Sequence, residues 1–127
     1  MSEMQSVAVG QKVRQVKRGE IYWVKFDKKS VGTEIRKPRP AVIVSNDWQN
    51  EVSKRVIVLP FSTKTEKVYY PIELLIKTGK IMCDQVKSID KQRLGDKLGE
   101  LDQKTMLKVD EVLIKLFALQ YRFNLWQ

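Results

Sequence analysis

The apolar and polar positions over the first hundred residues follow the pattern of short strands separated by polar stretches. Six segments are rich in β-branched, aromatic or aliphatic residues, and charged or glycine-containing stretches separate them. Short apolar segments bounded by turn-forming residues are typical of β-strands. The predicted strands are residues 18–26, 40–45, 55–61, 69–76, 81–87 and 97–101.

The connections between these strands are polar. Residues 27–37 and 64–67 carry charges and predict loops, and residues 46–54 predict a turn-like segment. Thr78-Gly79-Lys80 predicts a hairpin turn, because glycine adopts the backbone conformations that tight turns require.

The spacing of apolar residues changes after Asp102 and becomes helical. We therefore predict one C-terminal helix with Asp102 as its N-cap. Asp90 is predicted to cap a shorter helical turn over residues 92–94. The apolar face of the C-terminal helix would consist of Met106, Val109, Leu113, Leu116 and Phe117.

These elements predict a mainly β fold with a C-terminal helix. A strongly bent antiparallel sheet would close into a partial barrel, and the helix would cover an opening or an edge. A chain of 127 residues is long enough for one domain with one core. We expect this domain at residues 17–120, between a flexible basic tail at residues 1–16 and a C-terminal tail at residues 121–127.

The chain is strongly basic, with 24 Lys and Arg against 15 Asp and Glu, which gives a net charge of +9. Such a charge on a small domain favours a polyanionic partner, nucleic acid first, although it also serves solubility. No run of about 18 apolar residues predicts a membrane span, and the polar N-terminus does not resemble a signal peptide. With a single cysteine no internal disulfide can form, and we expect a cytoplasmic protein.

The sequence contains no histidine. This excludes an imidazole general acid or base and any zinc site that uses histidine ligands. The acidic residues are scattered, which does not favour a magnesium site, so we expect neither a cofactor nor a metal. Chemistry at neutral pH would depend on arginine, lysine, carboxylates and hydroxyls.

Arg39 lies between Pro38 and Pro40, immediately before a buried strand. Each proline fixes its own φ and restricts the residue before it to extended geometry. The guanidinium is thereby presented from a stiff segment, which suits planar recognition of a phosphate. Taken alone, the same residue could be an ordinary surface arginine at the start of a strand.

Several segments of the chain occur together in an order that is specific. They are Arg18-Gly19-Glu20-Ile21-Tyr22, Gly32-Thr33-Glu34, Arg39-Pro40-Ala41-Val42, Pro60-Phe61-Ser62-Thr63, the run Asp84-Gln85-Val86-Lys87-Ser88-Ile89-Asp90-Lys91-Gln92-Arg93-Leu94 and Lys108-Val109-Asp110-Glu111. With them, the chain resembles the MazF/PemK family of toxin endoribonucleases (mRNA interferases) over residues 17–119. The resemblance implies an SH3-like barrel that forms a homodimer, cuts single-stranded RNA without metal, and is inhibited by a cognate antitoxin protein.

The resemblance also implies roles for individual residues. The catalytic arginine of the family matches Arg39, and its loop glutamate matches Glu34. The hydroxyl at the end of the third strand, usually a threonine, matches Ser62, which leaves Ser62 or Thr63 as the working hydroxyl. The glycines that often precede the arginine are replaced here by residues 35–38, which changes the loop that governs base preference.

The chemistry of RNA cleavage fits a chain without histidine, because the 2′-OH beside the scissile phosphate is the nucleophile. An enzyme must align it, take its proton and stabilise charge on the phosphate oxygens. Arg39 would hold the phosphate, Ser62 or Thr63 would donate a hydrogen bond, and Glu34 would accept the proton. The expected products are a 2′,3′-cyclic phosphate and a 5′-hydroxyl, and no residue is assigned as the general acid.

Further residues are candidates for binding RNA, whose unstacked bases are readable in single strands. Gln85 could read base edges, and the other candidates could contact phosphate or sugar: Thr33, Thr63, Lys64, Lys87 and Ser88. The aromatic residues Trp48, Tyr69 and Tyr70 could stack on bases or simply pack. Asp84 and Gln85 could equally form a structural hydrogen-bonded pair, and Cys83 is expected to be a small core residue.

Two other functions remain open at this point. One is a toxin of the same fold that inhibits gyrase without catalysis, in the manner of CcdB, through Phe117 and Trp126 near the C-terminus. The other is a passive nucleic-acid-binding module, which the charge explains equally well. For the ribonuclease toxin, we expect the antitoxin to be an acidic chain whose C-terminal part is disordered on its own and binds in a basic groove.

Overall fold

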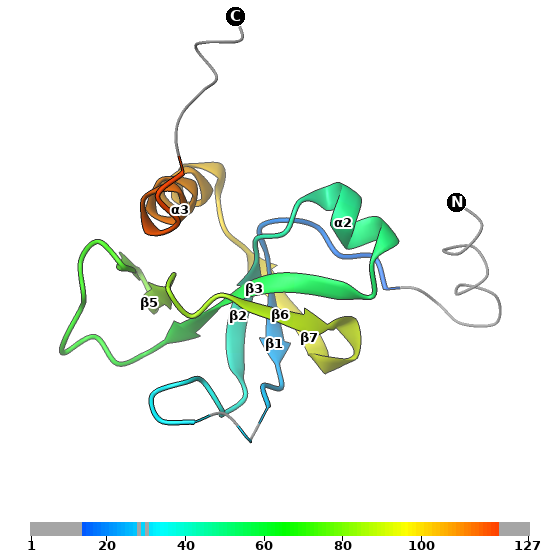
Figure 1. Ribbon diagram of the computed structural model, residues 1–127, viewed down its shortest axis with the longest axis horizontal. Helices are drawn as coiled ribbons and strands as arrows, with labels where there is room; N and C mark the ends of the chain where they lie inside the picture. Colours follow the sequence, from blue (N-terminus) through cyan, green and yellow to red (C-terminus); the bar gives the residue numbers. More distant parts are fainter. Residues whose placement is uncertain (1–13, 28, 30, 120–127) are drawn as a thin grey trace, which may run out of the picture.

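The computed structural model describes residues 14–27, 29 and 31–119 of the chain, and Figure 1 shows a bent antiparallel sheet with two helices above it. The sheet has seven strands within the described residues, in the order β4-β5-β3-β2-β1-β7, with β6 paired to β3 beside this path. The elements are β1 (Glu20–Val24), β2 (Arg39–Ile43), α2 (Asp47–Val52), β3 (Arg55–Ser62), β4 (Glu73–Ile76), β5 (Gly79–Met82), β6 (Lys87–Asp90), a 3-10 helix (Lys91–Arg93), β7 (Leu94–Glu100) and α3 (Gln103–Leu116).

Strand β3 makes the sheet bend, because it changes partners along its length. Its first half pairs with β6, from Arg55 opposite Asp90 to Val58 opposite Lys87. Its last two residues, Phe61 and Ser62, pair instead with β5. The fold class predicted from the sequence, mainly β with a C-terminal helix, is confirmed.

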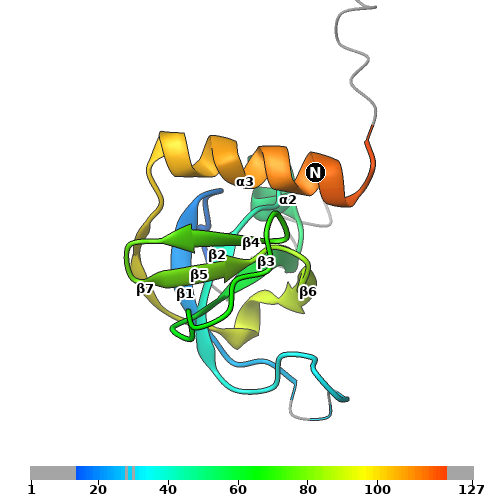
Figure 2. The same cartoon turned by 90° about the vertical axis from the view of Figure 1, so that its left-hand side faces the viewer.

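Two apolar clusters lie on opposite faces of the central strands. In β2, Ala41 and Ile43 belong to one cluster and Val42 to the other, and all three are fully buried. The prediction that this strand is buried on both faces is therefore correct. The second cluster extends under α3, which lies across the sheet in Figure 2.

Helix α3 begins as predicted, with Asp102 accepting a hydrogen bond from the Thr105 amide at 2.7 Å. Met106 and Val109 are buried against the sheet, and an ion pair between Arg18 and Asp110 ties the helix to the segment before β1. Phe117 was wrongly placed on the apolar face, because it caps the C-terminus of the helix and is 55% exposed.

Residues 46–54, predicted as a turn, contain helix α2. Asn46 caps it by accepting from the Gln49 amide at 2.8 Å. The helix is anchored by Asn50, whose buried side chain bonds both the hydroxyl and the carbonyl of Ser45. A short polar helix of this kind has no apolar period, and its stability comes from these tertiary hydrogen bonds.

The fourth and fifth strands are shorter than predicted. Residues 69–72 form a turn, in which the Glu73 amide donates to the Tyr69 carbonyl at 2.7 Å. Residues 81–87 are divided by a turn in which the Gln85 amide donates to the Met82 carbonyl at 3.1 Å. This turn redirects the chain from β5, at one end of β3, to β6 at the other.

Residues 1–13 of the predicted N-terminal tail and the whole predicted C-terminal tail, residues 121–127, lie outside the described residues. Val16, which the sequence analysis assigned to the N-terminal tail, is 3% exposed and packs in the first cluster. Arg14 donates to the Leu94 carbonyl at 2.9 Å and lies over the Tyr22 ring. The packed structure therefore begins before residue 17.

Candidate active site

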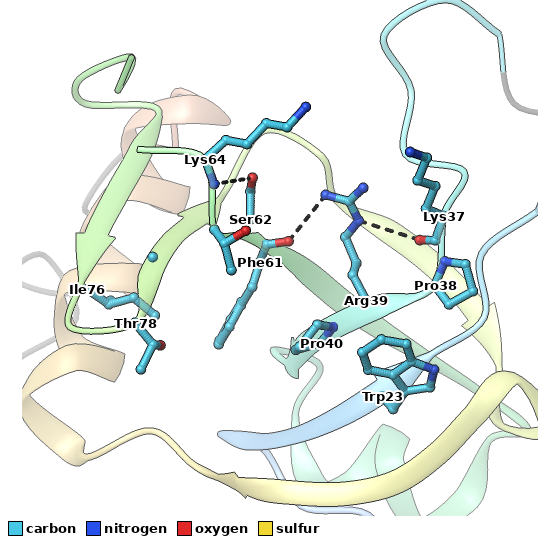
Figure 3. A pocket seen from close by; sticks show the side chains of 12 residues that line it. Trp23, Lys37, Pro38, Arg39, Pro40, Phe61, Ser62, Lys64, Ile76 and Thr78 are labelled. Carbon is cyan, nitrogen blue, oxygen red and sulfur yellow. Dashed lines mark hydrogen bonds between the residues drawn. The ribbon is translucent and has the colours of Figure 1, made fainter. Parts of the chain in front are cut away.

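A cavity of about 560 Å³ opens where the start of β2, the end of β3 and the β4–β5 hairpin meet (Figure 3). Its volume falls within the range of about 300–1,000 Å³ that is usual for small-molecule sites. It brings together segments that are distant in the sequence. The residues that line it are Trp23, Lys37, Pro38, Arg39, Pro40, Phe61, Ser62, Thr63, Lys64, Ile76, Thr78 and Gly79.

Arg39 is the first residue of β2 and lies half-buried at the edge of this cavity. Its guanidinium donates two long hydrogen bonds, to the carbonyls of Lys37 and Phe61, both at 3.4 Å. Ordinary N–H···O bonds are shorter, at about 2.7–3.2 Å. Burial lowers the pKa of Arg39 from its ordinary value, but an arginine keeps its charge at physiological pH.

No carboxylate pairs with Arg39 among the described residues. Of its five N–H groups, two are used in the long bonds. A half-buried cation with free donors next to a cavity is prepared to bind an anion. The predicted position of Arg39 as a stiffly presented guanidinium agrees with this geometry.

Ser62, at the end of β3, lines the cavity beside Arg39, and Figure 3 shows both polar groups on the same rim. The Ser62 hydroxyl accepts a hydrogen bond from the Lys64 amide at 3.1 Å. Since this bond uses a lone pair of the oxygen, the hydroxyl proton is available for another acceptor. Thr63 also lines the cavity and is exposed.

The β4–β5 hairpin approaches Ser62 closely because residue 79 is glycine. A Cβ at Gly79 would lie 2.3 Å from the Ser62 carbonyl oxygen, and the φ of this residue is +152°. The hairpin is fixed by a buried ion pair in which Lys80 Nζ lies 2.7 Å from Glu73 Oε1. Lys80 Nζ also donates to the Lys67 carbonyl at 2.8 Å, so the same pair holds the loop that follows Ser62.

Glu34 and Thr33 do not line the cavity. Both are exposed in the β1–β2 connection, where the Glu34 carboxylate accepts a hydrogen bond from the Val31 amide at 2.6 Å. Arg36, in the same connection, donates to the Gly32 carbonyl at 2.7 Å. None of the residues that line the cavity is acidic.

Lys87 and Ser88 line a second cavity of about 280 Å³. Its other residues are Phe26, Asp27, Ile35, Arg55, Ile89, Asp90 and Arg93. The Ser88 hydroxyl accepts from Arg55 Nε at 3.1 Å, and Arg55 Nη2 donates to the Ser88 carbonyl at 3.2 Å. Gln85 lies in the turn between β5 and β6 and lines neither cavity.

The sequence analysis missed Trp23, Lys37 and Phe61 as residues of the first cavity. Trp23 looked like an ordinary strand residue, and only the pairing of β1 with β2 brings it opposite Pro40. The aromatic residues that were considered instead, Tyr69 and Tyr70, are exposed but do not line either cavity.

Cys83 is a fully buried core residue, as predicted. Burial raises the pKa of its thiol to about 12, and the nearby carboxylates Asp84 and Glu73 add to this. Within the described residues, no three potential metal ligands among His, Cys, Asp and Glu gather in one place. No helix in the described part of the chain is long and apolar enough to cross a membrane.

Comparison with known proteins agrees with the resemblance stated from the sequence. Endoribonuclease EndoA of Bacillus subtilis (strain 168) is 35% identical over 112 residues, which cover 82% of this chain and 96% of the relative. Endoribonuclease MazF of Staphylococcus epidermidis is 31% identical over 106 residues, covering 77% of this chain and 88% of the relative.

Solved structures have the same fold. MazF from Deinococcus radiodurans superposes with a TM-score of 0.72 at 23% identity, over 84% of this chain and 99% of that one, which shows the fold. A mycobacterial endoribonuclease in complex with its cognate antitoxin gives a TM-score of 0.66 at 25% identity, over 84% and 98% of the two chains.

The family model described as PemK-like, MazF-like toxin of type II toxin-antitoxin system matches residues 17–117, nearly the whole of the described domain. This match spans both cavities and all strands of the sheet. The chain therefore belongs to the PemK-like, MazF-like toxins of type II toxin–antitoxin systems.

Proposed function

We propose that this protein is the toxin of a toxin–antitoxin pair and acts as a metal-independent, sequence-specific endoribonuclease on single-stranded RNA. Relatives at 31–35% identity are named endoribonucleases, and the chain spans 88–98% of their length. The observation that carries the proposal is Arg39, a half-buried guanidinium with free donors on a cavity that also presents the Ser62 hydroxyl.

Arg39 binds the scissile phosphate and stabilises the charge that develops on its oxygens as the 2′-OH attacks. Preorganised donors in a partly desolvated site stabilise such charge with little reorganisation. The Ser62 hydroxyl donates a hydrogen bond to a second non-bridging oxygen and keeps its proton. Attack by the 2′-oxygen forms a bond to phosphorus while the bond to the 5′-oxygen breaks. The 5′-oxygen leaves with the electron pair and takes a proton from solvent, which gives a 2′,3′-cyclic phosphate and a 5′-hydroxyl.

Glu34 is the proton acceptor in this proposal. The chain has no histidine and the cavity has no acidic lining residue, so a carboxylate must come from a neighbouring loop. Glu34 lies five residues before Arg39 in the connection that leads into the cavity. Glu34 lies outside the cavity lining, so the loop that holds it through the Val31 amide has to move for the carboxylate to reach the nucleophile.

The substrate is single-stranded because the reacting phosphate and its bases must enter a concave site. Lys37 and Lys64 line the cavity beside Arg39 and supply positive charge for the neighbouring phosphates. The β1–β2 connection joins both cavities, since Lys37 lines the first and Ile35 the second. A strand of RNA that passes this connection would meet Lys87 and Ser88 next, and Thr33 and Gln85 remain candidates for contacts beside this path.

The partners follow from the family and from the charge. An antitoxin with an acidic segment would cover the basic cavity region of a chain with net charge +9, and inhibition should weaken at high salt. We also propose that the toxin is a homodimer in the cytoplasm. Light scattering at micromolar concentration tests the dimer, and a monomer mass would contradict it.

A gyrase inhibitor of the same fold would not need the Arg39 cavity. That alternative rested on Phe117 and Trp126. Phe117 is exposed at the end of α3, and Trp126 lies outside the described residues. Phe117 lines neither of the two cavities described above, whereas Arg39 lines the first, so the ribonuclease is the better-supported function.

The test is to incubate the purified protein with a long single-stranded RNA in EDTA and to map the ends. We expect discrete cuts with 5′-hydroxyl ends, and the mapped positions give the sequence motif. Intact RNA after incubation with a folded, dimeric protein would contradict the proposal. Cuts that disappear in EDTA would contradict its metal independence.

A further inference from the structure

Trp23 is the one tryptophan of the described residues that lines the Arg39 cavity. It lies in β1, where Tyr22 and Val24 on either side point into the core and are buried. The alternation of the strand directs Trp23 to the opposite face. Trp23 is 40% exposed, so part of its surface is accessible from the cavity that it lines.

The indole is held in place by its neighbours on both adjacent strands. In the pairing of β1 with β2, Trp23 lies opposite Pro40, the residue after Arg39. On the other side, a Cβ at Gly95 would lie 3.3 Å from both Cβ and Cδ1 of Trp23. The absence of a side chain at Gly95 therefore leaves room for the indole next to β7.

Figure 3 shows the Trp23 indole and the Phe61 ring in the part of the cavity below the Arg39 guanidinium. The cavity thus has a cationic rim and an aromatic floor. A nucleotide has the same division, with a charged phosphate and a flat apolar face on its base. Bases of every kind present such a face, and stacking on aromatic side chains is a common way to bind single strands.

The other exposed aromatic residues do not share this setting. Trp48 is 70% exposed on α2, and it lines neither cavity. It is therefore a matched control, because it is the same residue type with more exposed surface and no neighbouring phosphate site.

We propose that the Trp23 indole is the stacking platform for the base of a nucleotide that adjoins the phosphate bound by Arg39. This inference rests on the proposed ribonuclease function and adds a base-binding residue to it. Stacking fixes the base and thereby the register of the RNA, so that one phosphate is placed at Arg39. Trp23 acts through binding and does not take part in proton transfer.

The experiment measures binding of an RNA oligonucleotide that carries the mapped cleavage motif but lacks the 2′-OH at the cut, so that it is bound and not cleaved. Stacking of one base is worth about 1–3 kcal/mol, which corresponds to a rise in Kd of about 5-fold to 150-fold for Trp23→Ala. Trp23→Phe keeps a π face and should stay within about threefold of the wild type. Trp23→Leu keeps apolar bulk without a π face and should behave like Trp23→Ala, whereas Trp48→Ala should change nothing.

The contacted base is identified by replacing the nucleotides on each side of the cut, one at a time, with an abasic residue. At the contacted position, the abasic RNA should bind the wild type about as weakly as Trp23→Ala binds the intact RNA. Combining the two changes should then cause no further loss, because both remove the same contact. If the affinity losses caused by Trp23→Ala and by the abasic residue multiply at every position tested, the inference is overturned.

The outcomes separate this inference from the proposed function. If Trp23→Ala and Trp23→Leu bind RNA like the wild type while cleavage still requires Arg39, the stacking platform is wrong and the ribonuclease stands. If the wild type cuts no RNA, the proposed function fails first. If the Trp23 variants lose antitoxin binding but not RNA binding, the aromatic floor serves the antitoxin, and the inference is overturned.

Discussion

Two cavities in the described part of this toxin are each lined by a serine and a neighbouring arginine, Ser62 with Arg39 and Ser88 with Arg55, but the two pairs are arranged differently. In the second cavity, Arg55 bonds the hydroxyl and the carbonyl of Ser88 at 3.1 and 3.2 Å. In the first, Arg39 has only two long carbonyl contacts at 3.4 Å. The Ser62 hydroxyl accepts from a backbone amide and keeps its proton free.

The difference lies in what each pair can still bind. Each arginine donates two hydrogen bonds within the protein. Those of Arg55 have ordinary lengths, and its exposed position leaves it in contact with solvent, where an ionic interaction contributes little. Arg39 is half-buried with unused donors, so an anion that enters the cavity replaces no strong internal bond. The two arginines therefore differ in the length of their internal hydrogen bonds and in their burial, and not in the number of bonds that they make.

The largest expected effect separates the two arginines. Arg39→Ala should lower the single-turnover rate of RNA cleavage at saturating RNA by about 10³-fold to 10⁵-fold, as for arginines that stabilise phosphoryl transition states. Arg55→Ala should change that rate by less than about tenfold. Equal losses in the two variants would remove the distinction between the cavities.

The serines give the next comparison. Ser62→Ala should slow cleavage by about 10²-fold to 10³-fold, the usual cost of removing one donor to a developing charge, whereas Ser88→Ala should stay within about threefold. Rate measurements at saturating RNA test this. A large loss in Thr63→Val with an active Ser62→Ala would show that the neighbouring hydroxyl is the working one.

Glu34 lies in the β1–β2 connection between the two cavities, and its role as the base can be tested separately. Glu34→Gln keeps an oxygen that can accept from the Val31 amide, so the hydrogen bond within the loop is retained, but it removes the carboxylate that acts as the base. We expect a loss of about 10²-fold in the cleavage rate. A wild-type rate in Glu34→Gln, with an impaired Glu34→Ala, would mean that the carboxylate only shapes its loop.

The first cavity also depends on a close backbone approach, which can be tested through stability. Gly79→Ala places a Cβ 2.3 Å from the Ser62 carbonyl at a φ of +152°, and should destabilise the fold by at least about 2 kcal/mol. Gly32→Ala, at a φ of +63° with open space around it, should cost about 1 kcal/mol. Urea unfolding checks both, and equal losses would contradict the close approach.

The smallest expected effect on stability concerns Cys83, which lies between β5, beside the first cavity, and β6, beside the second. Its pKa is raised to about 12 from an ordinary value of 9.0, chiefly by burial, so the folded thiol should not react with a thiol reagent at pH 8. Because the unfolded thiol ionises first, its contribution to stability is complete below pH 9.0 and declines as the pH rises toward 12. Rapid labelling of the folded protein at pH 8 would contradict this.

The elements with a clear local signal could be predicted from the sequence. The buried run 40–45, the caps Asp90 and Asp102 and the helical spacing after Asp102 each carry their information within a few residues. Helix α2 could not be predicted in this way, because it is held by Asn50 and its bonds to Ser45 rather than by an apolar period.

The residues of the site, too, could be predicted where the signal is local and not where it depends on tertiary structure. Arg39 and Ser62 were found because short motifs around them are specific, and both line the cavity. Trp23 was missed because it becomes part of the site only through the register of β1 with β2 and the room left by Gly95. Lys87 and Ser88 were grouped with the others in the sequence, yet the turn at Gln85 carries them to the second cavity.

The most direct test of the account is Arg39→Lys, measured for both single-turnover cleavage and RNA binding. Lysine keeps the charge but loses the planar pair of donors. If Arg39 stabilises the developing charge on the phosphate, the rate should fall by at least about 100-fold while the Kd for uncleavable RNA stays within about threefold. An unchanged rate with a raised Kd would show that Arg39 only binds the substrate, and would contradict the central claim.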